Sequence, residues 1–241
     1  MLGLVFLIVV LAVPIAAAAH DETPEKPALT VTGYGHMSLT PDTAFVTLGM
    51  ETTGRTVADA QRQNRATMNK VVERLKALQI ENERIQTSSF NVSPQYKPPP
   101  KRSEPSGGPP EIIGYVASNT MTIEVRNVDK VGAVIEETLA AGANQFQGLH
   151  WALRDERQPK LDALKQAAFN AREKATALSE ALKVKLVRLL TVSEDSRVVR
   201  PVPRIARSMM ALEAAGPETP VFSGEIRVDA TVTLVYEMVQ E

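Results

Sequence analysis

The sequence predicts an α+β protein in which an antiparallel or mixed sheet of long strands carries helices packed on one face. Apolar and polar residues alternate through 225–239, as expected for a strand with one dry and one wet face. Two stretches, 56–78 and 160–183, have the three-four apolar spacing of helices with one buried face. Shorter alternating segments lie between them, so the expected element order is β-β-α-β-β-α-β-α-β-β.

Two strands and a helix are expected at the start of the fold. Residues 29–36 read as a short strand that ends in Gly33 and Gly35, interpreted as backbone relief before the turn signal Thr40-Pro41-Asp42. Residues 44–53 alternate as a second strand. The helix over 56–78 then presents one apolar stripe, made of Met68, Val71, Val72, Leu75 and Leu78.

The middle of the chain predicts a hairpin. Residues 84–96 and 112–126 are strand-like, and the segment 97–110 between them holds six prolines and two glycines. A hairpin is the simplest topology for two long strands around one loop. The loop is long for such a connection, which leaves a flexible tip or a partner-contacting arm as its interpretation.

The next elements are a short helix, a strand and a long helix. The short helix covers 128–141, with Asn127 or Asp129 as N-cap and Gly142 as its stop. The strand over 144–153 turns Trp151 inward. Pro159 opens a helix that runs to Lys183, and its central alanines favour lying across a sheet over forming a coiled coil. The predicted buried seam is Leu161, Leu164, Ala168, Ala171, Ala175, Leu178 and Leu182.

The last strand needs a cover, and the helices over 56–78 and 160–183 are both expected to supply it. It is preceded by a strand over 186–193 and a long loop over 194–223, whose apolar patch 209–212 fits one helical turn. The outer face of the last strand carries the β-formers Thr231, Thr233, Val235 and Val239, with few charges among them. Because open sheets must protect or use their edges, we expect either this strand or the 84–126 hairpin at a subunit contact.

The N-terminus predicts export. Residues 1–19 are apolar and uncharged and end in four alanines, as in a secretory signal peptide cleaved after Ala19. No Lys or Arg precedes the apolar run, so an uncleaved anchor is the rival interpretation. The predicted organisation is a signal peptide over 1–19, a flexible tail over 20–28 and one domain over 29–241.

Composition excludes several classes of function. A net charge of −1 argues against a non-specific nucleic-acid binder. The chain has no cysteine, which excludes a disulfide framework, a lipoprotein attachment site and thiol chemistry. The eight methionines are interpreted as core filler, with sacrificial oxidation as the alternative.

We assign no catalytic, cofactor-binding or metal-binding residue, and we predict that the protein is not an enzyme. His20, His36 and His150 lack metal-ligand spacing, although a new N-terminus at His20 could bind Cu²⁺ or Ni²⁺ adventitiously. Gly33-x-Gly35 lacks the rest of a dinucleotide fingerprint, and Asp42 is interpreted as a turn cap. The one basic run is taken as a solvated loop rather than a contact for anionic lipid or a neighbouring subunit: Arg197, Arg200, Arg204 and Arg207.

Several short motifs resemble one family. The run from Gly33 to Ala44 resembles the glycine-x-glycine and proline-aspartate-x-alanine opening of the YggE/SIMPL-domain family. Further matches follow in the family's order: Ile85-Gln86-Thr87, residues 92–96, Gly114-Tyr115 with Ser118-Asn119, Gly142-Ala143-Asn144, and residues 167–181. The resemblance covers about 29–239, nearly the whole mature chain.

The resemblance implies a bacterial periplasmic or outer-membrane-associated protein of α+β fold. It also implies links to oxidative-stress protection and surface antigens, and a large ring-like oligomer in at least one relative. No family-wide catalytic residues are implied. We therefore expect a non-enzymatic homo-oligomer of the bacterial envelope, with a periplasmic small-ligand or metal-binding protein as the alternative.

Two positions depart from the family pattern. Gln79 and Lys183 stand where the family usually has glycine after a helix. We therefore expect left-handed backbone at both residues, a conformation that costs a non-glycine residue roughly 1 kcal/mol.

Overall fold

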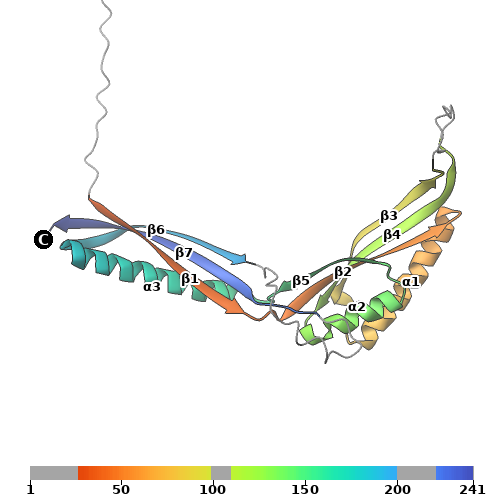
Figure 1. Cartoon of the computed structure of the whole chain (residues 1–241), viewed down its shortest axis with the longest axis horizontal. Coiled ribbons are helices and arrows are strands. Elements are labelled where there is room, and N and C mark those ends of the chain that lie inside the picture. The colour runs from red at the N-terminus through yellow and green to blue at the C-terminus, as the bar shows by residue number, and fades with distance from the viewer. Residues whose placement is uncertain (1–26, 99–109, 200–220, 241) are drawn as a thin grey trace, which may run out of the picture.

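The computed structural model describes residues 27–98, 110–199 and 221–240, which form two layered units (Figure 1). The first, called the α3 lobe, contains β1 (Ala28–Leu39), α3 (Arg157–Leu182), β6 (Val184–Val199) and β7 (Ile226–Gln240). The second, called the α1 lobe, contains β2 (Thr43–Gly54), α1 (Val57–Ala77), β3 (Ile85–Tyr96), β4 (Ile112–Val125), α2 (Val131–Ala140) and β5 (Gln145–Ala152). The α+β class and the predicted element order are confirmed.

The strands form two antiparallel sheets, with the orders β1-β7-β6 and β3-β4-β2-β5. Figure 1 shows α3 along one face of the first sheet, and α1 and α2 along one face of the second. The hairpin of β3 and β4 is confirmed, and Lys97 N–H donates to the Glu111 carbonyl oxygen at its end, at 2.9 Å. The rest of the loop, 99–109, lies outside the described residues.

The expectation that both long helices cover the last strand is wrong. α3 packs on β1 and β7, whereas α1 packs on β2 and β4. The side chains of the two helices explain the division. α1 buries the large residues Val71 and Leu75, which need a wider spacing from a sheet than the alanines of α3.

Each lobe has its own core. The α1 lobe buries Leu48, Met50, Leu75, Met121 and Ile123 among other large side chains, and Trp151 packs against them as predicted. The α3 lobe buries mostly small residues, with Ala163, Ala167, Ala171 and Ala175 against Val228, Ala230 and Val232. Buried Met50 and Met121 fit the interpretation of methionine as core filler.

Several element boundaries differ from the predicted ones. β1 continues past its glycines to Leu39, and β6 continues to Val199, into the range predicted as loop. Residues 194–199 are polar or charged in their first half, but they pair with residues 232–227 of β7. Without β6, the main-chain groups on that side of β7 would have no partner, so sheet pairing extends the strand beyond its own propensity.

The buried stripe of α3 also differs from the predicted seam. The buried residues are Pro159 and alanines 163, 167, 171 and 175, while Leu161, Leu178 and Leu182 are exposed. The smallest side chains let the helix axis approach the sheet most closely, so they decide which side of α3 faces inward. Lying across a sheet is confirmed.

The helix ends agree with the expectations. Asn127 caps a short 3₁₀ turn (Val128–Lys130) ahead of α2, and Gly142 after α2 has φ 114°. Gln79 has φ 65° and Lys183 has φ 55°, the left-handed conformation predicted for both. Within the part of the chain that the structure describes, no helix has the length and apolar content needed to span a membrane.

Candidate functional site: the two edges of the β1-β7-β6 sheet

The glycines of β1 set the contact between α3 and its sheet. A Cβ atom on Gly33 would lie 2.1 Å from the Ala167 carbonyl oxygen, and one on Gly35 would lie 2.1 Å from the Ala163 carbonyl oxygen. The interpretation of these glycines as relief before a turn is therefore wrong. They sit in mid-strand and admit the helix backbone, a close approach that any side chain would block.

This close approach brings polar side chains of α3 onto the free edge of β1. The Gln166 side-chain oxygen accepts the main-chain N–H of His36 at 2.7 Å, and that of Asn170 accepts the N–H of Tyr34 at 3.1 Å. Lys174 Nζ donates to the Thr32 carbonyl oxygen at 2.7 Å and lies 5.0 Å from the centre of the Tyr34 ring. Three successive outward-facing residues of β1 thus have a main-chain group capped by the helix.

The sequence contains a signal for this arrangement that apolar spacing alone does not reveal. Gln166, Asn170 and Lys174 each precede an alanine of the buried stripe, so they form a parallel row four residues apart. Long polar side chains beside a stripe of small residues can reach past the helix to a strand edge.

The opposite edge of the same sheet is β6, and it is built differently. Among the described residues, β6 pairs with β7 along one edge, and its other edge pairs with no strand. Apolar side chains in its middle are exposed to solvent: Val187 51%, Leu189 45%, Leu190 40% and Val192 57%. Within 27–98, 110–199 and 221–240, β6 is therefore a long, open and partly apolar strand edge.

The position of β7 corrects the expectation of an edge contact through the last strand. β7 lies between β1 and β6, so both of its edges are already paired. Its outer face, with Thr231 and Thr233, is only half-buried; Thr233 Oγ1 lies 3.2 Å from Thr32 Oγ1. Of the two elements expected at a subunit contact, the last strand and the 84–126 hairpin, the last strand could therefore contribute a face of the sheet but not an edge.

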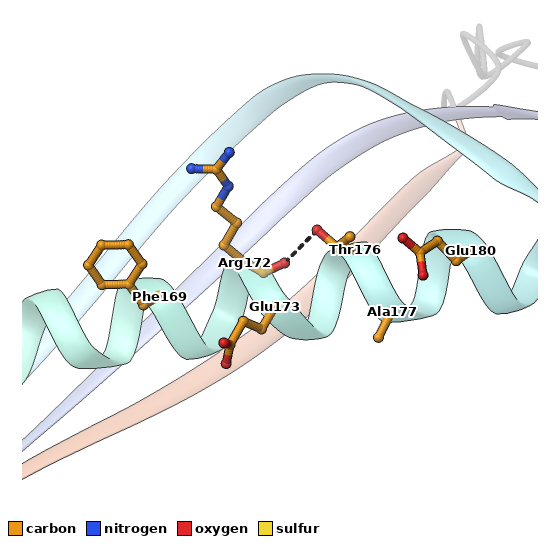
Figure 2. Close-up of a pocket in the computed structure, with 6 residues that line it drawn as sticks. All are labelled: Phe169, Arg172, Glu173, Thr176, Ala177 and Glu180. Atoms are coloured by element: carbon orange, nitrogen blue, oxygen red, sulfur yellow. Dashed lines mark hydrogen bonds between the residues drawn. The ribbon is translucent and has the colours of Figure 1, made fainter.

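The solvent side of α3 carries a shallow depression. Figure 2 shows its lining residues, all from this one helix: Phe169, Arg172, Glu173, Thr176, Ala177 and Glu180. The Thr176 hydroxyl donates to the Arg172 carbonyl oxygen at 3.1 Å, which is an internal bond of the helix. No second element of the described chain supplies an opposing wall, so the depression has the geometry of a helix surface rather than that of an enclosed ligand site.

The histidines that the sequence offered as candidate ligands are not brought together. His36 lies exposed on β1, and His150 stacks on Phe45 with ring centres 6.4 Å apart. His20 lies outside the described residues. Within 27–98, 110–199 and 221–240, no group of three or more His, Asp or Glu side chains has metal-binding geometry.

Asp42 caps a connection between the lobes rather than its own turn. Its Oδ1 accepts the main-chain N–H of Arg154 at 2.8 Å, and its Oδ2 accepts Arg154 Nε at 3.3 Å. Partial burial alone would raise the pKa of Asp42. The hydrogen bonds from the Arg154 main-chain N–H and guanidinium outweigh burial and lower this pKa below its usual value.

The basic run is only partly placed. Arg197 is exposed near the end of β6, and Arg200, Arg204 and Arg207 lie outside the described residues, as do residues 209–212 and most of the predicted loop.

Comparison with known proteins gives one family. Residues 29–236 match the model of SIMPL, described as a protein family of unknown function (DUF541). The 26 kDa periplasmic immunogenic protein of Brucella melitensis is 30% identical over 236 residues, covering 97% of this chain and 94% of that protein. The uncharacterized protein YggE of Escherichia coli strain K12 is 24% identical over 228 residues, covering 92% and 87%. The chain therefore belongs to the SIMPL family.

Proposed function

We propose that this protein is a non-enzymatic component of the bacterial envelope, located in the periplasm, that works as an assembly of identical subunits. The observation that carries the proposal is the open edge of β6 with its exposed apolar residues. Natural sheets normally cover, shorten or charge such an edge, because it is a ready template for pairing with another chain.

The location rests on the N-terminal segment and on the relatives. The name of the Brucella melitensis relative places that protein in the periplasm, and the apolar residues 1–19 fit a signal peptide. Expression of the full chain in a Gram-negative host should yield a soluble periplasmic protein whose first residue is His20, read by mass spectrometry of the intact protein. Recovery of the uncut chain in the membrane fraction would favour the anchor instead.

The assembly is tested by size-exclusion chromatography with light scattering on protein purified from the periplasm. The expected mass is a multiple of the monomer mass. It should stay constant over a dilution series until the protein concentration is low enough for the subunits to dissociate. A monomer at every concentration would remove the proposal. Association of the assembly with the outer membrane is tested by separating membranes from the soluble fraction without detergent and asking which fraction contains the protein.

A contribution to oxidative-stress protection is a further part of the proposal. The chain has no cysteine, and its described methionines include the buried Met50 and Met121, so any protection is expected to be indirect. Deletion of the gene should lower survival in hydrogen peroxide, and the wild-type gene should restore it. Equal survival of both strains would contradict this part and leave the assembly proposal standing.

A further inference from the structure

The two edges of one small sheet differ, and the difference points to a partner. The β1 edge is capped by Gln166, Asn170 and Lys174, while the β6 edge has no such cap among the described residues. Alternate residues of an edge strand direct their N–H and C=O groups outward, where a second strand can pair a whole row of them. The same helix that closes one edge therefore leaves the other open to strand addition.

Side chains on β6 extend the open edge into an apolar surface. Leu189 and Val192 pair with Tyr236 and Leu234 of β7, so all four side chains share the face on which α3 lies. Leu234 is 6% exposed, whereas Leu189 and Val192 are 45% and 57% exposed. α3 thus covers the middle of the sheet and reaches Leu186 and Val198 near the two ends of β6, but it leaves Leu189 and Val192 in the middle of that strand exposed beside the helix.

Charges along β6 select the partner and its direction. Lys185 and Arg188 lie in its first part, Glu194 and Asp195 lie further on, and the exposed apolar residues stand between them. An antiparallel second β6 centred at Leu190 places Lys185 of each copy opposite Asp195 of the other, while Arg188 is already paired with Glu237 of β7 at 2.6 Å. Parallel pairing in register would put like charges together, which is unfavourable. With this centre, Arg197 lies opposite Lys183 at the solvent-exposed ends, where salt screens their repulsion most.

Two irregularities make this edge selective. β6 has one extra residue at Val187 and another at Leu190, where its register with β7 shifts. Bulges on edge strands discourage indiscriminate pairing. Here the extra residues are apolar, so they add to the central surface of β6 and do not place a charge in it.

We infer that the open edge of β6 pairs antiparallel with β6 of a second copy of this chain, which joins two three-stranded sheets into one continuous sheet. The inference rests on the proposed assembly and names its contact surface.

The absence of cysteine allows a direct test. Residues opposite each other across an antiparallel pair have Cα atoms about 4.5–5.5 Å apart, within the range that a disulfide spans. In the full chain purified from the periplasm, each position from 187 to 193 is changed singly to cysteine and oxidised. One position, or two neighbouring positions near Leu190→Cys, should give a covalent dimer in high yield. The matched control, Glu180→Cys on the solvent side of α3, should give none above background.

A charge exchange gives a second readout that does not depend on oxidation. Lys185→Glu and Asp195→Lys should each weaken the assembly about tenfold or more by light scattering on a dilution series, and the double variant should recover most of the loss. Glu180→Lys is the control of equal charge change. Circular dichroism confirms that each variant is folded.

The outcomes separate the two proposals. A monomeric parent protein overturns the assembly itself. An assembled parent in which no β6 cysteine cross-links above the control, and in which the charge variants assemble like the parent, overturns the β6 contact and leaves the assembly in place.

Discussion

The two lobes of this protein solve the same packing problem with opposite residues. In the α1 lobe, large side chains such as Leu48, Leu75 and Ile123 fill a wide space between helix and sheet. In the α3 lobe, an alanine stripe meets Gly33 and Gly35, and backbone lies against backbone. The core of the α1 lobe depends on large side chains that fill the space between helix and sheet. The core of the α3 lobe depends on small residues that let the helix and the sheet come close together. Each lobe is therefore sensitive to a different class of substitution.

The largest expected effect is a cavity in the α1 lobe. Leu48 is fully buried, so Leu48→Ala should cost about 4 kcal/mol in the free energy of unfolding. In the α3 lobe, truncation of the half-buried Leu164 to alanine should cost only about 1 kcal/mol, because its removal opens no closed cavity. Urea denaturation of both variants measures the difference. Equal losses would mean that the α3 lobe also depends on large side chains.

Adding a side chain where the α3 lobe has none should destabilise that lobe. Gly35→Ala places a methyl group against the main chain of α3, and we expect a loss of about 3 kcal/mol. Gly148→Ala in β5 is the control, since its new Cβ meets nothing within 4 Å and its effect should stay within about 0.5 kcal/mol. Thermal melting of the two variants is the measurement. Similar melting temperatures would show that α3 can move away from β1 at little cost.

Loss of a side-chain hydrogen bond should cost more stability in the α1 lobe than in the α3 lobe. Asn64 is buried in the α1 lobe, and its side-chain amide donates to the carbonyl oxygens of Met50 and Ala117 at 3.3 and 3.2 Å. Asn64→Ala leaves these oxygens without that donor in a buried site, at an expected cost of about 2 kcal/mol. Asn170→Ala uncaps Tyr34 N–H at an exposed edge, where water substitutes, and should cost below about 1 kcal/mol. A larger loss from Asn170→Ala in chemical denaturation would contradict the comparison.

The two left-handed residues should respond unequally to glycine. Lys183→Gly relieves the backbone at the end of α3 and should stabilise the protein by up to about 1 kcal/mol. Gln79→Gly should gain less, because Lys130 Nζ donates to the Gln79 side-chain oxygen at 2.9 Å and that bond is lost. Differential scanning calorimetry checks both. A melting temperature at or below that of the parent for Lys183→Gly would contradict the account of strain.

The connection between the lobes should give the smallest effect, and one that depends on pH. The pKa of Asp42 is lowered in the folded protein, so its contribution to stability is present above its unfolded pKa of about 3.9 and is lost as pH falls through the folded value. Asp42→Asn should therefore cost less than about 1 kcal/mol at pH 7, since the pair is exposed, and nothing in strong acid. Denaturation curves at pH 7 and pH 2.5 test this. A cost that persists unchanged at the lower pH would show that the carboxylate charge is not involved.

Much of the fold was accessible from local patterns. Alternation along 225–239 and the stripe at Met68, Val71 and Leu75 act over a few residues, and element type and order followed from them. The left-handed residues at Gln79 and Lys183 were predicted through the family pattern, because the end of a helix is a local event. Strand lengths were less accessible, as in β6, where pairing with β7 carries the strand through polar residues.

The candidate surface was hidden for a different reason. Leu161, Leu178 and Leu182 give α3 an apolar periodicity that competes with its alanines, and hydrophobicity alone favours the leucines. The glycines that decide between them lie more than a hundred residues earlier, in β1. Which edge is capped depends in turn on which side of α3 faces inward.

By itself, the sequence determined the type and order of the elements, their caps and the absence of thiol chemistry, because each of these depends on neighbouring residues or on composition. Only the tertiary structure decided that the strands divide into two sheets, that Gly33 and Gly35 admit a helix, and that β1 is closed while β6 is open. Those features arise from contacts between segments far apart in the chain, whose meeting no local pattern records.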